Sequence, residues 1–327
     1  MTDSTYPATG GFVDNTSAAT FIPKLWSDEV RAAYKSNLVV APTVKKMPMT
    51  GKKGDTINVP APVRGDAHAK VENQAVTVQN NVEGNVQILI DKHYEFSRII
   101  EDITATQALD SLRQFYTDDA GYGLAKQIDT DLMLLGTGLG DGTYTSTPTA
   151  ADWVHSNCFY NDATNGKSAY AEDTVVPADL IDDAFIRGCI QELDDTDTPM
   201  DSRVWVVPPA LKNTLLGIDR FNSTDFVNSK GVASGQFGEV YGIPVYVSTN
   251  CPVIEAAADN TASSVDTRAA MLYHRDAFIL AEQAAIRSQT QYKQEWLGTL
   301  YTSDCLYGVK NYRPESGIVM AVPNVAG

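Results

Sequence analysis

The chain has 327 residues, of which 43% are hydrophobic and 20% charged, and its net charge at pH 7 is −16. This composition is typical of a globular protein with two or three packed units. The acidic balance argues against a nucleic-acid-binding enzyme with a broad basic face. No apolar run is long enough to predict a membrane span, and the N-terminus lacks the pattern of a secretion signal. The four scattered cysteines predict free thiols in a reducing compartment.

Residues 1–45 are expected to form an N-terminal arm. The first 20 residues are small and polar, which is typical of an extended segment. A short helix is predicted after Pro23, because proline suits the first turn of a helix. Asn37 and Pro42 are expected to end it.

Residues 46–100 predict an extended β-hairpin loop, because apolar and polar residues alternate with a period of two. Such a two-stranded ribbon is marginally stable alone in water, so it needs a surface to lie on. Its basic side chains are candidates for contacts between subunits: Lys45, Lys46, Lys52, Lys53, Arg64 and Lys70. Two aspartates oppose these six cations, which leaves a net +4 attached to an acidic remainder of −20. This asymmetry favours self-association, with a solvated charged loop as the alternative.

A long helix is predicted over residues 104–135. Its apolar residues recur at steps of three and four, and the glycines from Gly136 are expected to end it. Gly121 and Gly123 fall mid-helix, where each glycine costs roughly 1 kcal/mol against alanine. They are candidates for a flexible point in the helix, and the alternative is that they let a neighbour pack closely.

The remaining residues mix helices and strands without a βαβα rhythm, so the predicted fold class is α+β. Residues 136–175 are rich in turn-forming residues and are expected to hold two short strands. Helices are predicted at 178–193, 209–216 and 276–283, and strands at 204–207, 240–249, 271–273, from 286 onward and at 317–322.

Motifs for catalysis or cofactor binding are weak in this sequence. The glycines from Gly136 have the wrong spacing for a dinucleotide loop, Ser234 has the wrong spacing for a nucleophile elbow, and the four histidines are dispersed. We therefore assign no catalytic, cofactor or metal residues. Acidic residues between Asp194 and Asp201 leave a metal-dependent soluble hydrolase as a less favoured alternative. The aromatic residues in strand-like stretches, Trp296 among them, are expected in a core or an interface.

Several short strings, in their order along the chain, resemble the major capsid proteins of tailed bacteriophages with the Hong Kong 97 fold. The resemblance is greatest to the coat proteins of short-tailed phages. The strings are 54–60 (GDTINVP), 203–209 (RVWVVPP), 238–245 (GEVYGIPV), 274–278 (HRDAF) and 307–315 (YGVKNYRPE). Each string alone is a weak signal, and the resemblance rests on the order of the strings along the chain.

This resemblance implies five regions: an arm (1–45), an extended loop (46–100), a peripheral domain with a spine helix (101–175), an axial domain (176–279) and closing peripheral strands (280–327). It implies a non-enzymatic subunit that forms hexamers and pentamers of an icosahedral shell, which expands as DNA enters. Expected partners are other copies, a separate scaffolding protein, a portal and packaged DNA bound without sequence specificity, with no membrane. The expected location is the virion, after assembly in the host cytoplasm. A decoration or accessory virion protein is the alternative.

Overall fold

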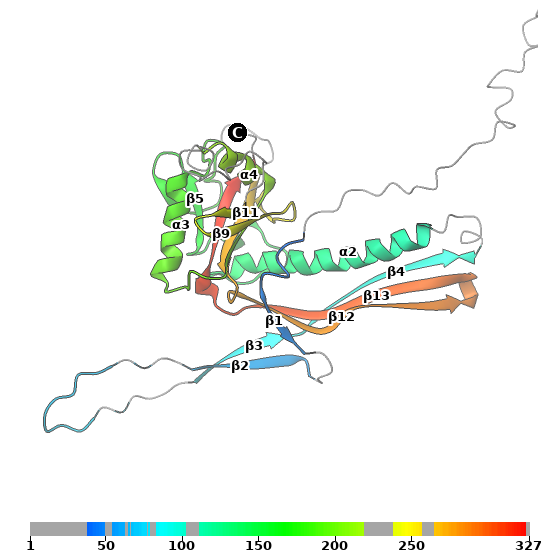
Figure 1. Ribbon diagram of the computed structural model, residues 1–327, viewed down its shortest axis with the longest axis horizontal. Coiled ribbons are helices and arrows are strands. Elements are labelled where there is room, and N and C mark those ends of the chain that lie inside the picture. Colours follow the sequence, from blue (N-terminus) through cyan, green and yellow to red (C-terminus); the bar gives the residue numbers. More distant parts are fainter. Residues whose placement is uncertain are drawn as a thin grey trace, which may run out of the picture.

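Two large β-sheets joined by a long helix organise the described part of the chain (Figure 1). The structure is a computed structural model. It describes residues 38–49, 54–62, 65, 67–76, 78, 83–102, 111–218, 238–256 and 265–324, with only the backbone at 111–117. The helix predicted after Pro23 lies outside these residues.

The first sheet has four strands in the order β1-β12-β13-β4. Its strands are β1 (Lys45–Pro48), β12 (Phe278–Lys293), β13 (Gly298–Asn311) and β4 (Lys92–Glu101). β12 and β13 form a long antiparallel hairpin, closed by the 3-10 turn η3 (Gln294–Trp296). Short β1 runs parallel to β12 at one edge, and β4 runs antiparallel to β13 at the other.

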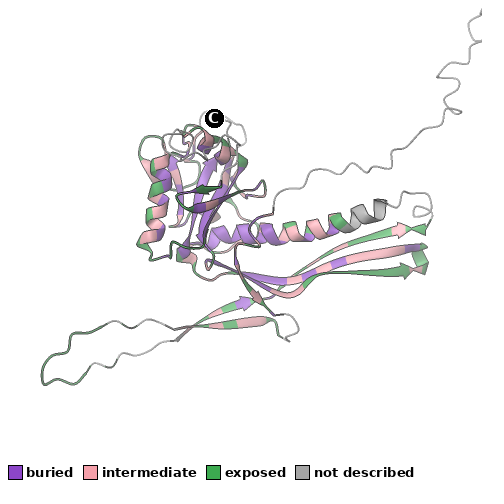
Figure 2. Cartoon of the chain, in the orientation of Figure 1, coloured by how far each residue is buried: buried purple, intermediate pink, exposed green. Residues whose placement is uncertain are grey.

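Helix α2 (Ser111–Leu134) runs along this sheet and continues into η1 (Leu135–Gly138). Leu124, Ile128 and Leu132 lie in the core that the helix shares with the sheet. Figure 2 shows that the end of α2 near η1 is buried, whereas its middle is partly exposed. The described part of this helix agrees with the prediction over residues 104–135, and residues 103–110 lie outside the described range. Among the described helices, none has the length and apolar character needed to cross a bilayer.

The second sheet has the order β6-β5-β14-β11-β7-β9-β8, and β10 pairs with β11. Helices α3 and α4 pack against it through a second apolar core that includes Phe185, Leu211 and Trp205. Its strands are β5 (Cys158–Asp162), β6 (Gly166–Ala169), β7 (Arg203–Val207), β8 (Glu239–Val240), β9 (Ile243–Val247), β10 (Val253–Glu255), β11 (Thr267–His274) and β14 (Gly317–Pro323). The helical segments in this half of the chain are α3 (Asp183–Asp195), α4 (Pro209–Leu216), η2 (Ala150–Trp153) and η4 (Pro314–Ser316).

A separate antiparallel hairpin, β2 (Thr56–Pro62) and β3 (Glu83–Leu89), lies beside the first sheet near β1. Its root packs through Ile88 on Ile279 and the neighbouring residues of β12. The predicted ribbon over residues 46–100 is therefore too long at both ends. β1 and β4 belong to the four-stranded sheet, because their backbones pair with β12 and β13.

The predicted short helix at 276–283 is wrong, because this stretch opens strand β12. Phe278 and Leu280 pack in the core beneath α2, while Ile279 and Ala281 pack against the root of the β2–β3 hairpin. Burial on both faces produces a continuous apolar run, and periodicity cannot distinguish such a run from a buried helix.

The predicted boundaries of the axial domain also differ from the structure. The eight-stranded sheet includes β5 and β6, which precede residue 176, and β14, which follows residue 279. Helix α3 begins at residue 183, five residues later than predicted, because Asp182 caps it by accepting a hydrogen bond from the Phe185 amide at 2.8 Å.

Candidate functional site

The two cations of the basic segment that the structure describes near β1 differ in their surroundings. Lys45 pairs with Asp276 of its own chain at 3.5 Å, and its ammonium lies 4.8 Å from the centre of the Tyr312 ring. Lys46, the next residue on β1, is exposed. Of these two side chains, Lys46 is the better candidate for a contact with another molecule.

Lys70 lies in the loop of the β2–β3 hairpin, where its ammonium binds the loop itself. It donates to the Val71 carbonyl at 2.6 Å and to the Gln74 carbonyl. The loop curls around this charge, because one ammonium satisfies two carbonyls. Its charge is thus already compensated in part within the chain, which weakens the prediction that Lys70 serves an intersubunit ion pair.

Lys52, Lys53 and Arg64 lie outside the described residues, so their predicted role as contact residues stays a prediction. The described part of the same loop presents a feature that the charge pattern does not reveal. Val71, Val76 and Val78 are strongly exposed. The β-hairpin predicted over residues 46–100 includes Val76 and Val78, but these residues have no strand partner in the described loop. In the sequence, the available signal for this exposed apolar surface was three valines separated mostly by polar residues.

Gly121 and Gly123 lie on the accessible side of α2. A Cβ atom built on either glycine meets nothing within 4 Å. Within the described part of this chain, no segment packs closely on either glycine, so packing of a neighbour on them stays a prediction. Their role as flexible points in the helix stays a prediction.

The last turns of α2 carry two buried aspartates that connect the helix to the rest of the chain. Asp131 pairs with Lys92 of β4 at 3.2 Å and accepts a hydrogen bond from the Tyr307 hydroxyl of β13 at 2.7 Å. Lys92 also donates to the Tyr144 hydroxyl at 3.0 Å. Burial opposes the charge of Lys92, but the Tyr144 hydrogen bond and the Asp131 carboxylate together raise its pKa.

Asp129, two residues earlier, faces a different segment. Its carboxylate accepts hydrogen bonds from the amides of Val40 at 2.8 Å and Ala41 at 3.3 Å, and from the Asn250 side chain at 3.4 Å. Burial raises the pKa of Asp129 in spite of these donors. One stretch of helix therefore holds the end of the arm, the loop after β9 and the four-stranded sheet together.

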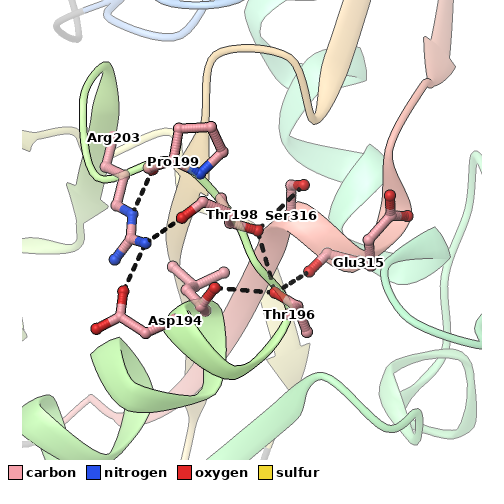
Figure 3. A network of polar contacts seen from close by, with 8 residues as sticks. Asp194, Thr196, Thr198, Pro199, Arg203, Glu315 and Ser316 are labelled. Carbon is pink, nitrogen blue, oxygen red and sulfur yellow. Dashed lines mark hydrogen bonds and ion pairs between the residues drawn. The ribbon is translucent and has the colours of Figure 1, made fainter.

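Of the acidic residues between Asp194 and Asp201, Asp194 is engaged in a structural network of polar contacts (Figure 3). The buried Arg203 guanidinium binds Asp194 at 2.6 Å and donates to the carbonyls of Thr198 and Pro199. The hydroxyl of Thr198 in turn lies 3.3 Å from that of Ser316. Within the described ranges, no group of three or more histidine, cysteine or acidic side chains is arranged to hold a metal ion.

The comparisons with known proteins point to one family. A sequence model of the family described as phage capsid protein matches residues 20–307. The chain belongs to the phage capsid protein family. This capsid protein is a structural subunit of a phage head, and its place is the virion. A comparison with curated protein sequences found no match.

Solved capsids share the fold of this capsid protein over nearly its whole length. The chain of Mycobacterium phage Che8 has a TM-score of 0.69 at 21% identity, and the match covers 92% of this chain and 97% of that one. The capsid of Cyanophage P-SCSP1u has a TM-score of 0.71 at 16% identity, with coverage of 99% and 100%. The mature capsid of bacteriophage PhiM1 has a TM-score of 0.67 at 16% identity, with 93% of each chain covered. The predicted Hong Kong 97 type of fold is confirmed.

Proposed function

We propose that copies of this capsid protein form the hexamers and pentamers of an icosahedral shell, with the β2–β3 hairpin of one copy lying on the surface of the next. The observation that supports this proposal is the isolation of the hairpin. β2 and β3 pair with each other in a sheet of their own, and only the root residues belong to an apolar cluster among the described residues. A two-stranded hairpin of this kind gains stability from a neighbouring surface.

The charge distribution favours the same arrangement. Residues 45–70 carry a net +4 on a chain of −16, so the hairpin of one copy is attracted to the acidic surface of another. A single exposed ion pair contributes roughly 0–1 kcal/mol. A closed shell repeats such contacts in every subunit, which turns weak contacts into stable association.

The remaining parts of the proposal concern partners and maturation. Assembly in the host cytoplasm uses a separate scaffolding protein and a portal, and the shell expands as DNA enters. The acidic net charge limits the binding of DNA to the inner wall, so the genome can slide during packaging. The main alternative, a decoration or accessory protein, is less favoured because the fold match covers a whole capsid subunit.

The test reverses the charges of the loop. A variant with Lys52→Glu, Lys53→Glu and Arg64→Glu is expected to fold as a subunit and to form no particles when co-expressed with the scaffolding protein. Negative-stain electron microscopy counts the particles, and circular dichroism reports folding. The matched control reverses Arg187, Lys212 and Lys310, three cations outside the hairpin, and is expected to form normal particles. Normal heads from the loop variant would contradict the role of the hairpin.

A further inference from the structure

Strand β4 forms one edge of the four-stranded sheet, as Figure 1 shows. It pairs with β13 on one side, and in the part of the chain that the structure describes no strand lies on its other side. The backbone amides and carbonyls that point away from β13 therefore lack a strand partner. Such an edge is a template for pairing with a strand of another chain.

The edge lacks the features by which natural proteins block such pairing, which include short strands, proline and bulges. β4 has ten residues, contains no proline or glycine, and pairs with β13 along its whole length without a shift in register. The neighbouring pair β12–β13 has two such shifts. An inward-pointing charge can also block an edge, but Lys92 is already paired with Asp131 of its own chain at 3.2 Å.

The side chains of β4 alternate between the two faces of the sheet. Tyr94 faces the core beneath α2. The opposite face carries five exposed side chains, in the order His93, Glu95, Ser97, Ile99 and Glu101. A histidine and a glutamate stand at the two ends of this row, and a small serine stands at its centre. The row therefore complements itself when a second copy is turned end for end.

We propose that β4 of one copy pairs antiparallel with β4 of a second copy about a two-fold axis at Ser97. The inference rests on the proposed function, because it names a further contact between copies in the shell. His93 of each copy then lies opposite Glu101 of the other, and Glu95 lies opposite Ile99. A contact of this kind uses the same surface of both copies and joins chains two at a time.

The charges favour this register over its neighbours. An axis at Arg98 would set that side chain against its own copy, and Glu95 against Glu101. An axis at Phe96 would set Asp91 against Glu101. Like charges directly opposite each other destabilise a pair of strands, and opposite charges stabilise it. An axis at Ser97 places no like charges opposite each other.

The experiment introduces Ser97→Cys into the full-length chain. The four native cysteines are buried, so the new thiol reacts selectively. Oxidation of assembled particles with copper phenanthroline is expected to give disulfide-linked dimers on a non-reducing gel. No larger species is expected, since each chain carries a single new thiol.

The matched control is Thr302→Cys. Thr302 lies beside Ser97 on strand β13, with 3.5 Å between the two hydroxyl oxygens. In the proposed pairing the two Thr302 positions are three strand spacings apart, roughly 14 Å, which exceeds the limit of roughly 7 Å between the Cα atoms of a disulfide. This variant is therefore expected to give no dimer. Equal dimer yields from the two variants would contradict the pairing.

A second cross-link tests the register. Particles assembled from a mixture of His93→Cys chains and tagged Glu101→Cys chains are expected to give mixed dimers. Neither variant alone is expected to cross-link, because two His93 positions, or two Glu101 positions, lie roughly 27 Å apart along the paired strands. Dimers from either variant alone would overturn this register.

Amide hydrogen exchange tests the backbone pairing. In the lone subunit, the amides of β4 that bond to β13 are expected to exchange slowly, and the alternate amides fast. In particles, exchange of the alternate amides is expected to slow at least tenfold. Unchanged exchange of these amides in particles would overturn the pairing.

The outcomes also separate the two proposals. Particles that form but give no Ser97 dimer overturn the β4 contact and leave the proposed function intact. Slowed exchange without the dimer assigns the edge to another occupant, such as the N-terminal arm or the scaffolding protein, and also overturns this inference. A wild-type chain that forms no particles with its scaffolding protein overturns the proposed function itself.

Discussion

Tyr307 donates a 2.7 Å hydrogen bond to Asp131, and this buried contact ties strand β13 to helix α2. The same carboxylate pairs with Lys92, whose side chain is 14% exposed. Removing Lys92 would leave the Asp131 charge buried without its cation. We therefore expect Lys92→Met to lower the free energy of unfolding by about 3 kcal/mol, which urea unfolding of the lone subunit measures.

The control for this prediction is an ion pair near the surface. Lys45 and Asp276 pair at 3.5 Å with side chains that are each more than one third exposed. Lys45→Met is expected to cost less than about 1 kcal/mol, since solvent screens exposed pairs. Equal losses in the two variants would show that burial does not set the strength of the Lys92 pair.

Alanine at Gly121 and Gly123 is expected to stabilise the isolated subunit. The added methyl groups have free space within 4 Å, and alanine favours a helix over glycine by about 1 kcal/mol at each site. Thermal unfolding measures this gain. Gly308→Ala is the contrasting variant, because its Cβ would lie 2.0 Å from the Leu89 carbonyl oxygen and must destabilise. If the helix alanines stabilise the subunit but block assembly, the glycines serve bending or packing in the shell.

The ion pair between Asp304 and Arg287 predicts that the free energy of unfolding depends on pH in the acid range. Arg287 donates two hydrogen bonds to its carboxylate, at 2.8 and 2.7 Å, and lowers the pKa of Asp304 to about 2. An aspartate in the unfolded chain has a pKa of about 4, so the ionised Asp304 side chain stabilises the folded state above that pH. This contribution is lost as the pH falls from about 4 to about 2.

Asp304→Asn should therefore be less stable than the wild type at neutral pH, by no more than about 1 kcal/mol because Arg287 is largely exposed. Urea unfolding at several pH values should show the two proteins converging in acid. A difference in stability that stays constant from neutral pH to about pH 2 would contradict the role of this pair.

The four cysteines are expected to resist labelling in the folded protein. Burial raises the pKa of the Cys189 and Cys251 thiols to about 12, and all four side chains are buried. A thiol-reactive chromophore should react only after denaturation, when four thiols per chain become available. Fast labelling of the native protein would show that one of these sites opens.

Local patterns predicted the elements whose residues follow a single period. The α2 helix, strand β7 and helix α4 lie where their apolar spacing and prolines indicate. The prediction failed at residues 276–283, where both faces of strand β12 are covered and the apolar run has no period. It also failed for β4, because alternation reveals a strand but not its partner, which here is 205 residues away at the Ser97–Thr302 pair.

The candidate site was harder to predict than the fold. The charge pattern of the sequence indicated Lys70 as a contact residue, but in the folded loop its ammonium donates hydrogen bonds to carbonyls of the same loop. Trp296 and Leu297, at the turn between β12 and β13, are 64% and 66% exposed because the long hairpin carries them away from the core, and a single sequence does not show this exposure. The pairing of Asp131 with Lys92 likewise arises from tertiary packing between α2 and β4.

The loop of the β2–β3 hairpin reaches far beyond the rest of the subunit in Figure 1. If this hairpin lies on the next copy, as proposed above, a chain that lacks the loop can still accept the hairpin of a neighbour but has none to place on another copy. We expect such a truncated chain to stop the growth of particles when it is mixed with intact subunits, and a small fraction of it to suppress head formation.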